Sequence, residues 1–104
     1  MFEDFFADRI SFLRNQKNVS AREMSLAIGQ NSSYINRIEN KIALPSMQAF
    51  FYICEYFQIT PKEFFDEEES NPMKINHIAD ELKNLDSVQL DTVLAVIRGL
   101  QHKK

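Results

Sequence analysis

The sequence predicts an all-α protein, with five short helices in one domain and two further helices in a C-terminal extension. The 104 residues include only 2 Gly and 3 Pro. No stretch alternates apolar and polar residues as a half-buried strand does. Apolar residues recur instead at the three- and four-residue spacings of amphipathic helices, and capping residues precede several of these stretches.

The first helix is expected over about residues 3–16. Phe6, Ile10 and Leu13 form its main apolar stripe, and acidic residues lie near its positive N-terminal end. Three further aromatic residues make this helix more apolar than one contact face requires, which indicates that a second side is packed: Phe2, Phe5 and Phe12.

A short second helix is expected to begin after Ser20. Ser20 with Glu23 three residues later has the form of a capping box. Met24 and Ile28 are the apolar residues that this helix buries. Two small residues permit a close helix crossing: Ser25 and Ala27.

Residues 29–40 form a third helix with a sharply divided surface. Gly29 can end the preceding helix, and Asn31 can act as the N-cap of the next one. Ile35 and Ile38 lie three residues apart and face inward. The opposite face gathers short amides and hydroxyls around one arginine: Ser32, Ser33, Asn36, Arg37 and Asn40.

This polar face has a composition that solubility alone does not explain. Lys and Glu favour helix and dominate ordinary exposed faces, whereas Ser and Asn weaken a helix. Base edges in DNA provide a reason, because Arg can donate two hydrogen bonds to guanine, Asn can pair with adenine, and Ser serves either. A helix is also narrow enough to enter the major groove. The face therefore predicts contacts with double-stranded DNA.

Two more helices complete this domain. Ser46 caps a helix over residues 47–57, and Thr60, followed by Pro and Glu at the first and third helical positions, begins a helix that ends at Phe65. The fourth helix carries an inner stripe and surplus aromatic residues: Phe50, Ile53, Cys54 and Phe57 inward, with Phe51, Tyr52 and Tyr56 in surplus.

An acidic stretch separates the helix-turn-helix domain, residues 1–66, from the extension, residues 67–104. The extension is expected to form helices over about 72–85 and 87–101, the second capped by Asp86 with Gln89. Such a hairpin cannot bury its own apolar faces, so it packs on the domain's surplus aromatics, on a second copy of itself, or on both. The residues expected to face inward on the first helix are Ile75, Ile78, Leu82 and Leu85. The second helix carries an apolar stripe that is expected at the centre of a dimer interface: Leu90, Val93, Leu94, Ile97 and Leu100.

Charge and composition restrict the function further. The net charge is −3, but residues 1–65 hold 7 basic and 7 acidic side chains, so any DNA contact depends on a local basic patch and on two subunits acting together. The single Cys54 fits a small buried core residue in a reducing compartment. No signal peptide and no apolar run of about 20 residues is present, so a cytoplasmic protein without membrane contact is expected.

Nothing in the sequence predicts an enzyme. His77 and His102 lack metal-ligand spacing, and no phosphate-binding glycine loop, nucleophile elbow or carboxylate pair in a pocket-like context is present. We therefore expect no catalytic residues, metal, cofactor or small-molecule substrate.

From Arg9 to Phe65 the chain resembles the Cro/lambda-repressor-type helix-turn-helix family, also called the xenobiotic-response-element regulators. The landmarks that carry this resemblance occur in one register: Arg9-Ile10-x-x-Leu13-Arg14, Ser20-x-x-Glu23-Met24, Gly29, Tyr34-Ile35-Asn36-Arg37-Ile38-Glu39-Asn40, Leu44-Pro45-Ser46-Met47, Ile53-Cys54 and Ile59-Thr60-x-x-Glu63-Phe64-Phe65.

The resemblance implies a five-helix lambda-repressor-like domain whose recognition helix covers about residues 31–39. It matches Arg14 and Glu39 to a structural salt bridge. It places Ser32, Ser33, Asn36 and Arg37 at bases and, at the DNA backbone, Ser20, Arg22, Tyr34, Asn40, Lys41 and Lys17.

The chain departs from the family pattern at four positions in and beside the motif, and the departures at Ala21 and Lys41 bear on DNA contact and on the end of the recognition helix; the others are Ser25 and Gln30. Ala21 stands where a phosphate-contacting Gln is common, so Ser20, Arg22 or Lys17 must substitute. Lys41 replaces the usual Gly after the recognition helix, where a left-handed conformation costs Lys roughly 1 kcal/mol, and Asn40 can take that conformation instead.

Two functions follow from the sequence. The first is a repressor-like, sequence-specific DNA-binding transcriptional regulator, a homodimer that reads a near-palindromic site and dimerises through the second helix of the extension. The alternative is a protein-interaction module whose DNA-binding surface has decayed, which the acidic balance and Ala21 favour.

Overall fold

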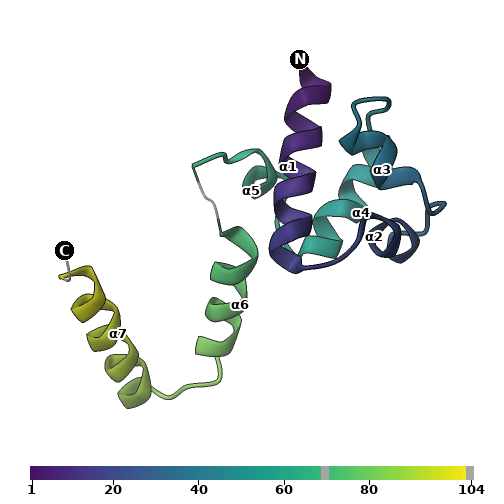
Figure 1. The fold of residues 1–104 in the computed structure, drawn as a ribbon. Helices are drawn as coiled ribbons and strands as arrows, with labels where there is room; N and C mark the ends of the chain where they lie inside the picture. The colour runs from purple at the N-terminus through teal and green to yellow at the C-terminus, as the bar shows by residue number, and fades with distance from the viewer. Residues whose placement is uncertain (69–70, 103–104) are drawn as a thin grey trace. The chain divides into compact units, whose positions relative to one another are not determined.

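The computed structural model describes residues 1–68 and 71–102, and these residues form seven helices and no strand, which confirms the all-α class. The chain divides into two compact units, Met1–Ser70 and Asn71–Lys104. Figure 1 shows the helices: α1 (Phe2–Lys17), α2 (Ala21–Ala27), α3 (Tyr34–Glu39), α4 (Met47–Phe57) and α5 (Pro61–Phe65) in the first unit, then α6 (Pro72–Leu82) and α7 (Ser87–Gln101) in the second.

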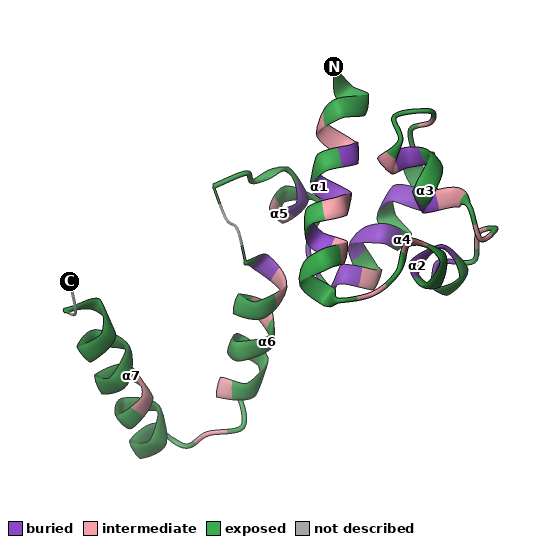
Figure 2. Cartoon of the chain, in the orientation of Figure 1, coloured by how far each residue is buried: buried purple, intermediate pink, exposed green. Residues whose placement is uncertain are grey.

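The first unit has a single apolar core to which all five of its helices contribute. α3 packs on both α1 and α2. Each apolar stripe predicted for the helices of this unit contributes buried residues, and buried residues are purple in Figure 2. The most deeply buried side chains of this core include Ile10, Leu13, Met24, Ile35, Ile38, Ile53, Phe57 and Phe64.

The predicted capping residues begin their helices as expected. Ser20 and Glu23 form a capping box at α2, Thr60 and Glu63 form one at α5, and the Ser46 hydroxyl accepts a hydrogen bond from the Ala49 backbone N–H at α4. These caps satisfy N–H groups that have no partner within the helix. Because these interactions span only three residues, the sequence alone predicts them well.

The third helix is shorter than predicted. Regular helix begins at Tyr34, and residues 31–33 form a turn before it. The Asn31 side chain accepts hydrogen bonds from the Ser33 backbone N–H at 3.1 Å and from the Ser33 hydroxyl at 2.9 Å. These bonds hold a local turn and leave Ser33, with no side-chain cap bond, at the N-cap position.

The prediction that Asn40 takes the left-handed conformation after α3 is wrong. Asn40 has φ −90° and ψ 10°, whereas Lys41 has φ 65°. The Lys41 and Ile42 N–H groups bond to carbonyl groups of α3 at 3.0 and 2.9 Å. These two hydrogen bonds require a sharp turn at residue 41, so it is Lys41 that takes the left-handed backbone conformation.

The surplus aromatic residues of α1 pack partly on α5. Phe5 stacks on Phe65 with 5.6 Å between ring centroids, and Phe6 lies 5.4 Å from Phe64. The second packed side predicted for α1 is therefore the α5 side. Phe2 and Phe12 remain exposed.

Arg9 is a buried residue outside the predicted apolar stripe of α1. Its guanidinium group donates hydrogen bonds to the carbonyl oxygens of Phe64 at 2.6 Å, Glu63 at 2.8 Å and Asp66 at 3.2 Å. It thus supplies donors for the orphan carbonyls at the end of α5. The bond to Asp66 ties the start of the acidic stretch to the first unit.

In the second unit, α6 ends at Leu82 and not near residue 85. Lys83, Asn84 and Leu85 each donate a backbone hydrogen bond three residues back, the pattern of consecutive turns. α7 has the predicted bounds and the predicted Asp86–Gln89 capping box, but it contains no buried residue. The expected inward placement is wrong for Ile75 and Ile78, which are about half exposed in the part of the chain that the structure describes.

None of the described helices is long and apolar enough to cross a membrane.

Candidate nucleic-acid interface

The turn between α2 and α3 is fixed by backbone geometry. Gly29 adopts the left-handed conformation, with φ 79°, which costs Gly nothing because it has no Cβ. The N–H groups of Gly29 and Gln30 return to α2 carbonyls at 3.1 and 2.9 Å. The sharp end of α2 sets the direction from which α3 begins.

Ser25 joins the two helices of this motif, a role that its small size did not predict. Its buried hydroxyl donates to the Ala21 carbonyl oxygen at 2.7 Å and accepts from the Ile35 backbone N–H at 2.9 Å. Ile35 N–H lies in the first turn of α3, where an intrahelical acceptor is missing. One hydroxyl therefore caps α3 and ties it to α2. The available signal was a Ser on the same face as Met24 and Ile28.

The ion pair expected between Arg14 and Glu39 is present and fixes the far end of α3. Arg14 donates from Nε to Oε2 at 2.7 Å and from a terminal nitrogen to Oε1 at 3.0 Å. The two side chains are only 17% and 16% exposed. Arg14 also donates to the Val19 carbonyl oxygen at 2.8 Å. The pair raises the pKa of Arg14, and the bidentate geometry anchors α3 on α1.

The outer face of α3 is polar and open, as its sequence predicts. Ser33, Asn36, Arg37 and Asn40 are exposed, and Ser32 is half-buried. The Asn40 amide donates to the Asn36 side-chain oxygen at 2.8 Å. This oxygen has a second lone pair and the Asn36 amide group keeps its donors, so Asn36 can still form the bidentate pair with adenine.

Arg37 is the arginine that the polar face of α3 carries; Arg22, which is also exposed, lies on α2. The guanidinium groups of Arg9 and Arg14 are committed to carbonyls and to Glu39. The Arg37 side chain forms no hydrogen bond or ion pair with residues 1–68 or 71–102. Its five donors in a planar fork remain available for an external acceptor.

The residues expected at the DNA backbone lie in different environments. Ser20 and Arg22 are exposed at the start of α2, although the Ser20 hydroxyl also serves as the cap. Tyr34 is half-buried; burial raises its pKa, while a hydrogen bond with the Ser46 backbone acts in the opposite direction. Of these three residues only Arg22 carries a positive charge, so they do not form a basic row.

Two lysines from the same prediction are already engaged. Lys41 Nζ lies 2.9 Å from Asp4 Oδ1 of α1, and this contact raises the pKa of Lys41 and lowers that of Asp4. Lys17 Nζ lies 5.1 Å from the centre of the Tyr56 ring on α4. Both lysines are exposed, so these contacts are weak enough for a phosphate to replace.

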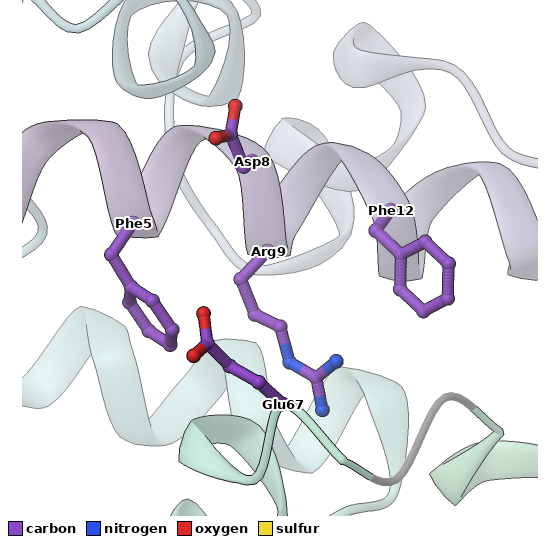
Figure 3. Close-up of a pocket in the computed structure, with 5 residues that line it drawn as sticks. All are labelled: Phe5, Asp8, Arg9, Phe12 and Glu67. Carbon is purple, nitrogen blue, oxygen red and sulfur yellow. The ribbon is translucent and has the colours of Figure 1, made fainter.

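A separate hollow on α1 has a volume of about 390 Å³. Figure 3 shows Phe5, Arg9 and Phe12 along one side of the helix, with Glu67 approaching from the segment after α5. Asp8 completes the lining. Because the Arg9 guanidinium already bonds to three carbonyls, this hollow offers DNA phosphate no uncommitted cation.

Comparison with protein families matches the Helix-turn-helix family model to residues 10–64. This range contains α2, the turn and α3, and it also contains the Arg14–Glu39 pair. No significant match is found among curated proteins or solved structures. The matched range, the capped helix-turn-helix geometry and the open polar face agree, and the chain belongs to the Cro/lambda-repressor-type helix-turn-helix family of DNA-binding transcriptional regulators.

Proposed function

We propose that the protein reads a near-palindromic DNA site as a homodimer, with α3 of each subunit in the major groove. Arg37, Asn36, Ser33 and Ser32 would contact base edges. The observation that carries this proposal is the uncommitted Arg37 guanidinium on an exposed face of short amides and hydroxyls. Two such helices would enter major grooves about one helical turn, or ~34 Å, apart.

Backbone contacts would set the register of α3 without reading sequence. Ser20, Arg22, Tyr34 and Asn40 lie on or beside the motif and carry groups that can reach phosphate oxygens. Lys41 and Lys17 would join them by exchanging Asp4 and Tyr56 for phosphate. A single unit offers few cations, so two units on one duplex are needed for useful affinity.

The homodimer is supported by the apolar surface of the second unit. Leu90, Leu94 and Ile97 are 38%, 42% and 40% exposed on α7, and a helix of this length is marginally stable in water without a packed apolar face. A second copy would cover this surface, together with Val93 and Leu100.

Selection from random duplex DNA with the purified protein at moderate salt tests this function. We expect an enriched two-fold-symmetric motif. Arg37→Ala should lose preference at one position of each half-site, which costs ~1–3 kcal/mol per contact. Arg22→Ala should weaken binding to all sequences alike and reduce the salt slope by about 0.9 per phosphate lost. Lys62→Ala on exposed α5 is the matched control and should behave like the parent protein.

Failure to enrich any motif, at any salt concentration that permits binding, would contradict sequence-specific recognition. An enriched motif unchanged by Arg37→Ala would contradict the role of the α3 face. The first result would direct attention to the alternative, a protein-interaction module that uses exposed aromatic residues such as Phe51 and Phe65.

A further inference from the structure

We propose that two copies of α7 pair antiparallel along their apolar seams, in a single register that the charged residues beside the seam select. This inference rests on the homodimer of the proposed function and specifies its interface. The occupant of the exposed α7 face is a second copy of this chain, because the charges beside that face complement themselves only when the helix direction is reversed.

The apolar seam of α7 follows a spacing typical of paired helices. Leu90, Leu94 and Ile97 are separated by four and three residues, and Ser87 and Gln101 extend the pattern at both ends. The three apolar side chains are similarly exposed, at about two-fifths each. They form a narrow stripe along one side of the helix, the geometry of a coiled-coil seam.

Two different flanks border this seam. Asp91 and Arg98 each follow a seam residue by one position and lie seven residues apart, so they line the same flank. Val93 and Leu100 line the other flank at the same spacing. Asp91 and Arg98 are exposed, and neither forms an ion pair within the described part of the chain. One flank is thus charged with both signs, and the other is apolar.

In an antiparallel pair each flank meets its own counterpart on the other helix. Pairing Leu94 with the partner subunit's Ile97 brings Asp91 beside the partner subunit's Arg98 on the charged flank. The same alignment brings Val93 beside the partner subunit's Leu100 on the apolar flank. The central seam pair, the charged flank and the apolar flank are therefore matched in one register, in which Leu90 faces the partner subunit's Gln101. Each contact occurs twice because the interface is two-fold symmetric.

Other arrangements lose this agreement. A shift of one heptad in either direction places Asp91 opposite the partner subunit's Asp91, or Arg98 opposite the partner subunit's Arg98. A parallel pair places Asp86 near the partner subunit's Asp91 and leaves Arg98 beside an apolar residue. Like charges at these positions oppose association, so the charges exclude the wrong registers and the wrong direction.

Charge exchange in the full chain, measured without DNA, tests this inference. Asp91→Lys and Arg98→Glu should each weaken the homodimer about tenfold, because two attractive contacts become two repulsive ones. The double variant Asp91→Lys/Arg98→Glu should recover the parent dissociation constant. A mixture of the two single variants should form heterodimers in preference to homodimers. Thr92→Lys and Thr92→Glu place the same charges on the exposed side of α7 and serve as controls.

Sedimentation equilibrium gives the dissociation constants, and energy transfer between N-terminal labels on the two variants reports heterodimers. Recovery in the double variant and preference in the mixture would support the register. A dimer that both exchanges leave unchanged would overturn the inference while leaving the DNA-reading homodimer intact. A protein that stays monomeric at every concentration would overturn this interface and the homodimer, whereas the Arg37→Ala selection would still decide whether α3 reads DNA.

Discussion

Replacing Ser25 with Ala tests whether one buried hydroxyl holds the helix-turn-helix together. In the native structure this hydroxyl donates to the Ala21 carbonyl and accepts from the Ile35 N–H. The substitution removes one oxygen from a fully buried position. It leaves the helix propensity of α2 as good or better, because Ala is the strongest helix former. Any loss of stability therefore comes from the hydrogen bonds.

The size of the destabilisation depends on which hydrogen bonds the Ala21 carbonyl and the Ile35 N–H keep after the substitution. The Ala21 carbonyl retains an intrahelical partner, so its loss is small. The Ile35 N–H lies at a fully buried residue, in a helical turn where no backbone acceptor replaces the hydroxyl. A buried donor without an acceptor costs ~1–3 kcal/mol, and loss of a helix cap costs ~0.5–2 kcal/mol. We expect Ser25→Ala to lower the free energy of unfolding by about 1.5 kcal/mol.

Urea and thermal unfolding of the full chain measure this effect. The urea midpoint should fall without a change in slope, and the melting temperature should fall by roughly 6–12 °C for a unit of this size. Ser11→Ala is the matched control, since Ser11 lies within α1, is only half-buried and forms no hydrogen bond through its side chain within the described residues. If Ser25→Ala and Ser11→Ala were equally stable within about 0.3 kcal/mol, the Ser25 hydroxyl would not be the tie between α2 and α3.

Three further predictions concern other named contacts. Arg14→Met and Glu39→Gln should each destabilise the protein. A double-mutant cycle should give a coupling energy of about 1 kcal/mol, because the bidentate ion pair is mostly shielded from water. Additive effects of the two substitutions would count against a direct interaction. Asp4→Asn should release Lys41 and tighten DNA binding, because Lys41 then reaches phosphate without giving up its contact with Asp4. An unchanged affinity for DNA would show that Lys41 does not reach phosphate. Since Lys41 lowers the pKa of Asp4, the parent protein should lose this contact as the pH falls through the lowered pKa, and the Asn variant should lack that dependence. Burial raises the pKa of Cys54 to about 11, so a thiol reagent at pH 8 should modify this residue only after the protein unfolds. Any stabilisation from the neutral thiol should be lost as the pH rises from the unfolded-state pKa of ~8.5 to about 11. Rapid labelling of the native protein would contradict this burial.

Local signals explain why the helices of the first unit could be predicted from the sequence. Capping boxes at Ser20 and Thr60 join residues three apart, and an apolar stripe needs only the period of the helix. The polar face of α3 was predictable for the same reason, because its members share one turn-by-turn spacing. The starts of α2, α4, α5 and α7 accordingly agree with the structure, while the start of α3 does not, since Asn31 serves a turn before the helix.

The contacts that hold this face in place depended on tertiary structure. Ser25 and Ile35 are brought together only when α2 and α3 cross, and Arg9 reaches carbonyl groups 54 to 57 positions away in the sequence. The spacing of residues along one helix gives no distance between two helices, so the roles of Ser25 and Arg9 could not be predicted from the sequence pattern.

The sequence by itself determined the class of fold, most helix boundaries and the chemistry of the α3 surface, since these depend on neighbours within one or two turns. Only the tertiary structure decided which charged groups form contacts within the protein and which remain available to bind a ligand. Arg9, Arg14 and Arg37 have the same side chain, and the first two are committed to carbonyls and a carboxylate while the third is exposed. Burial and partners separate them, and both arise when distant segments pack.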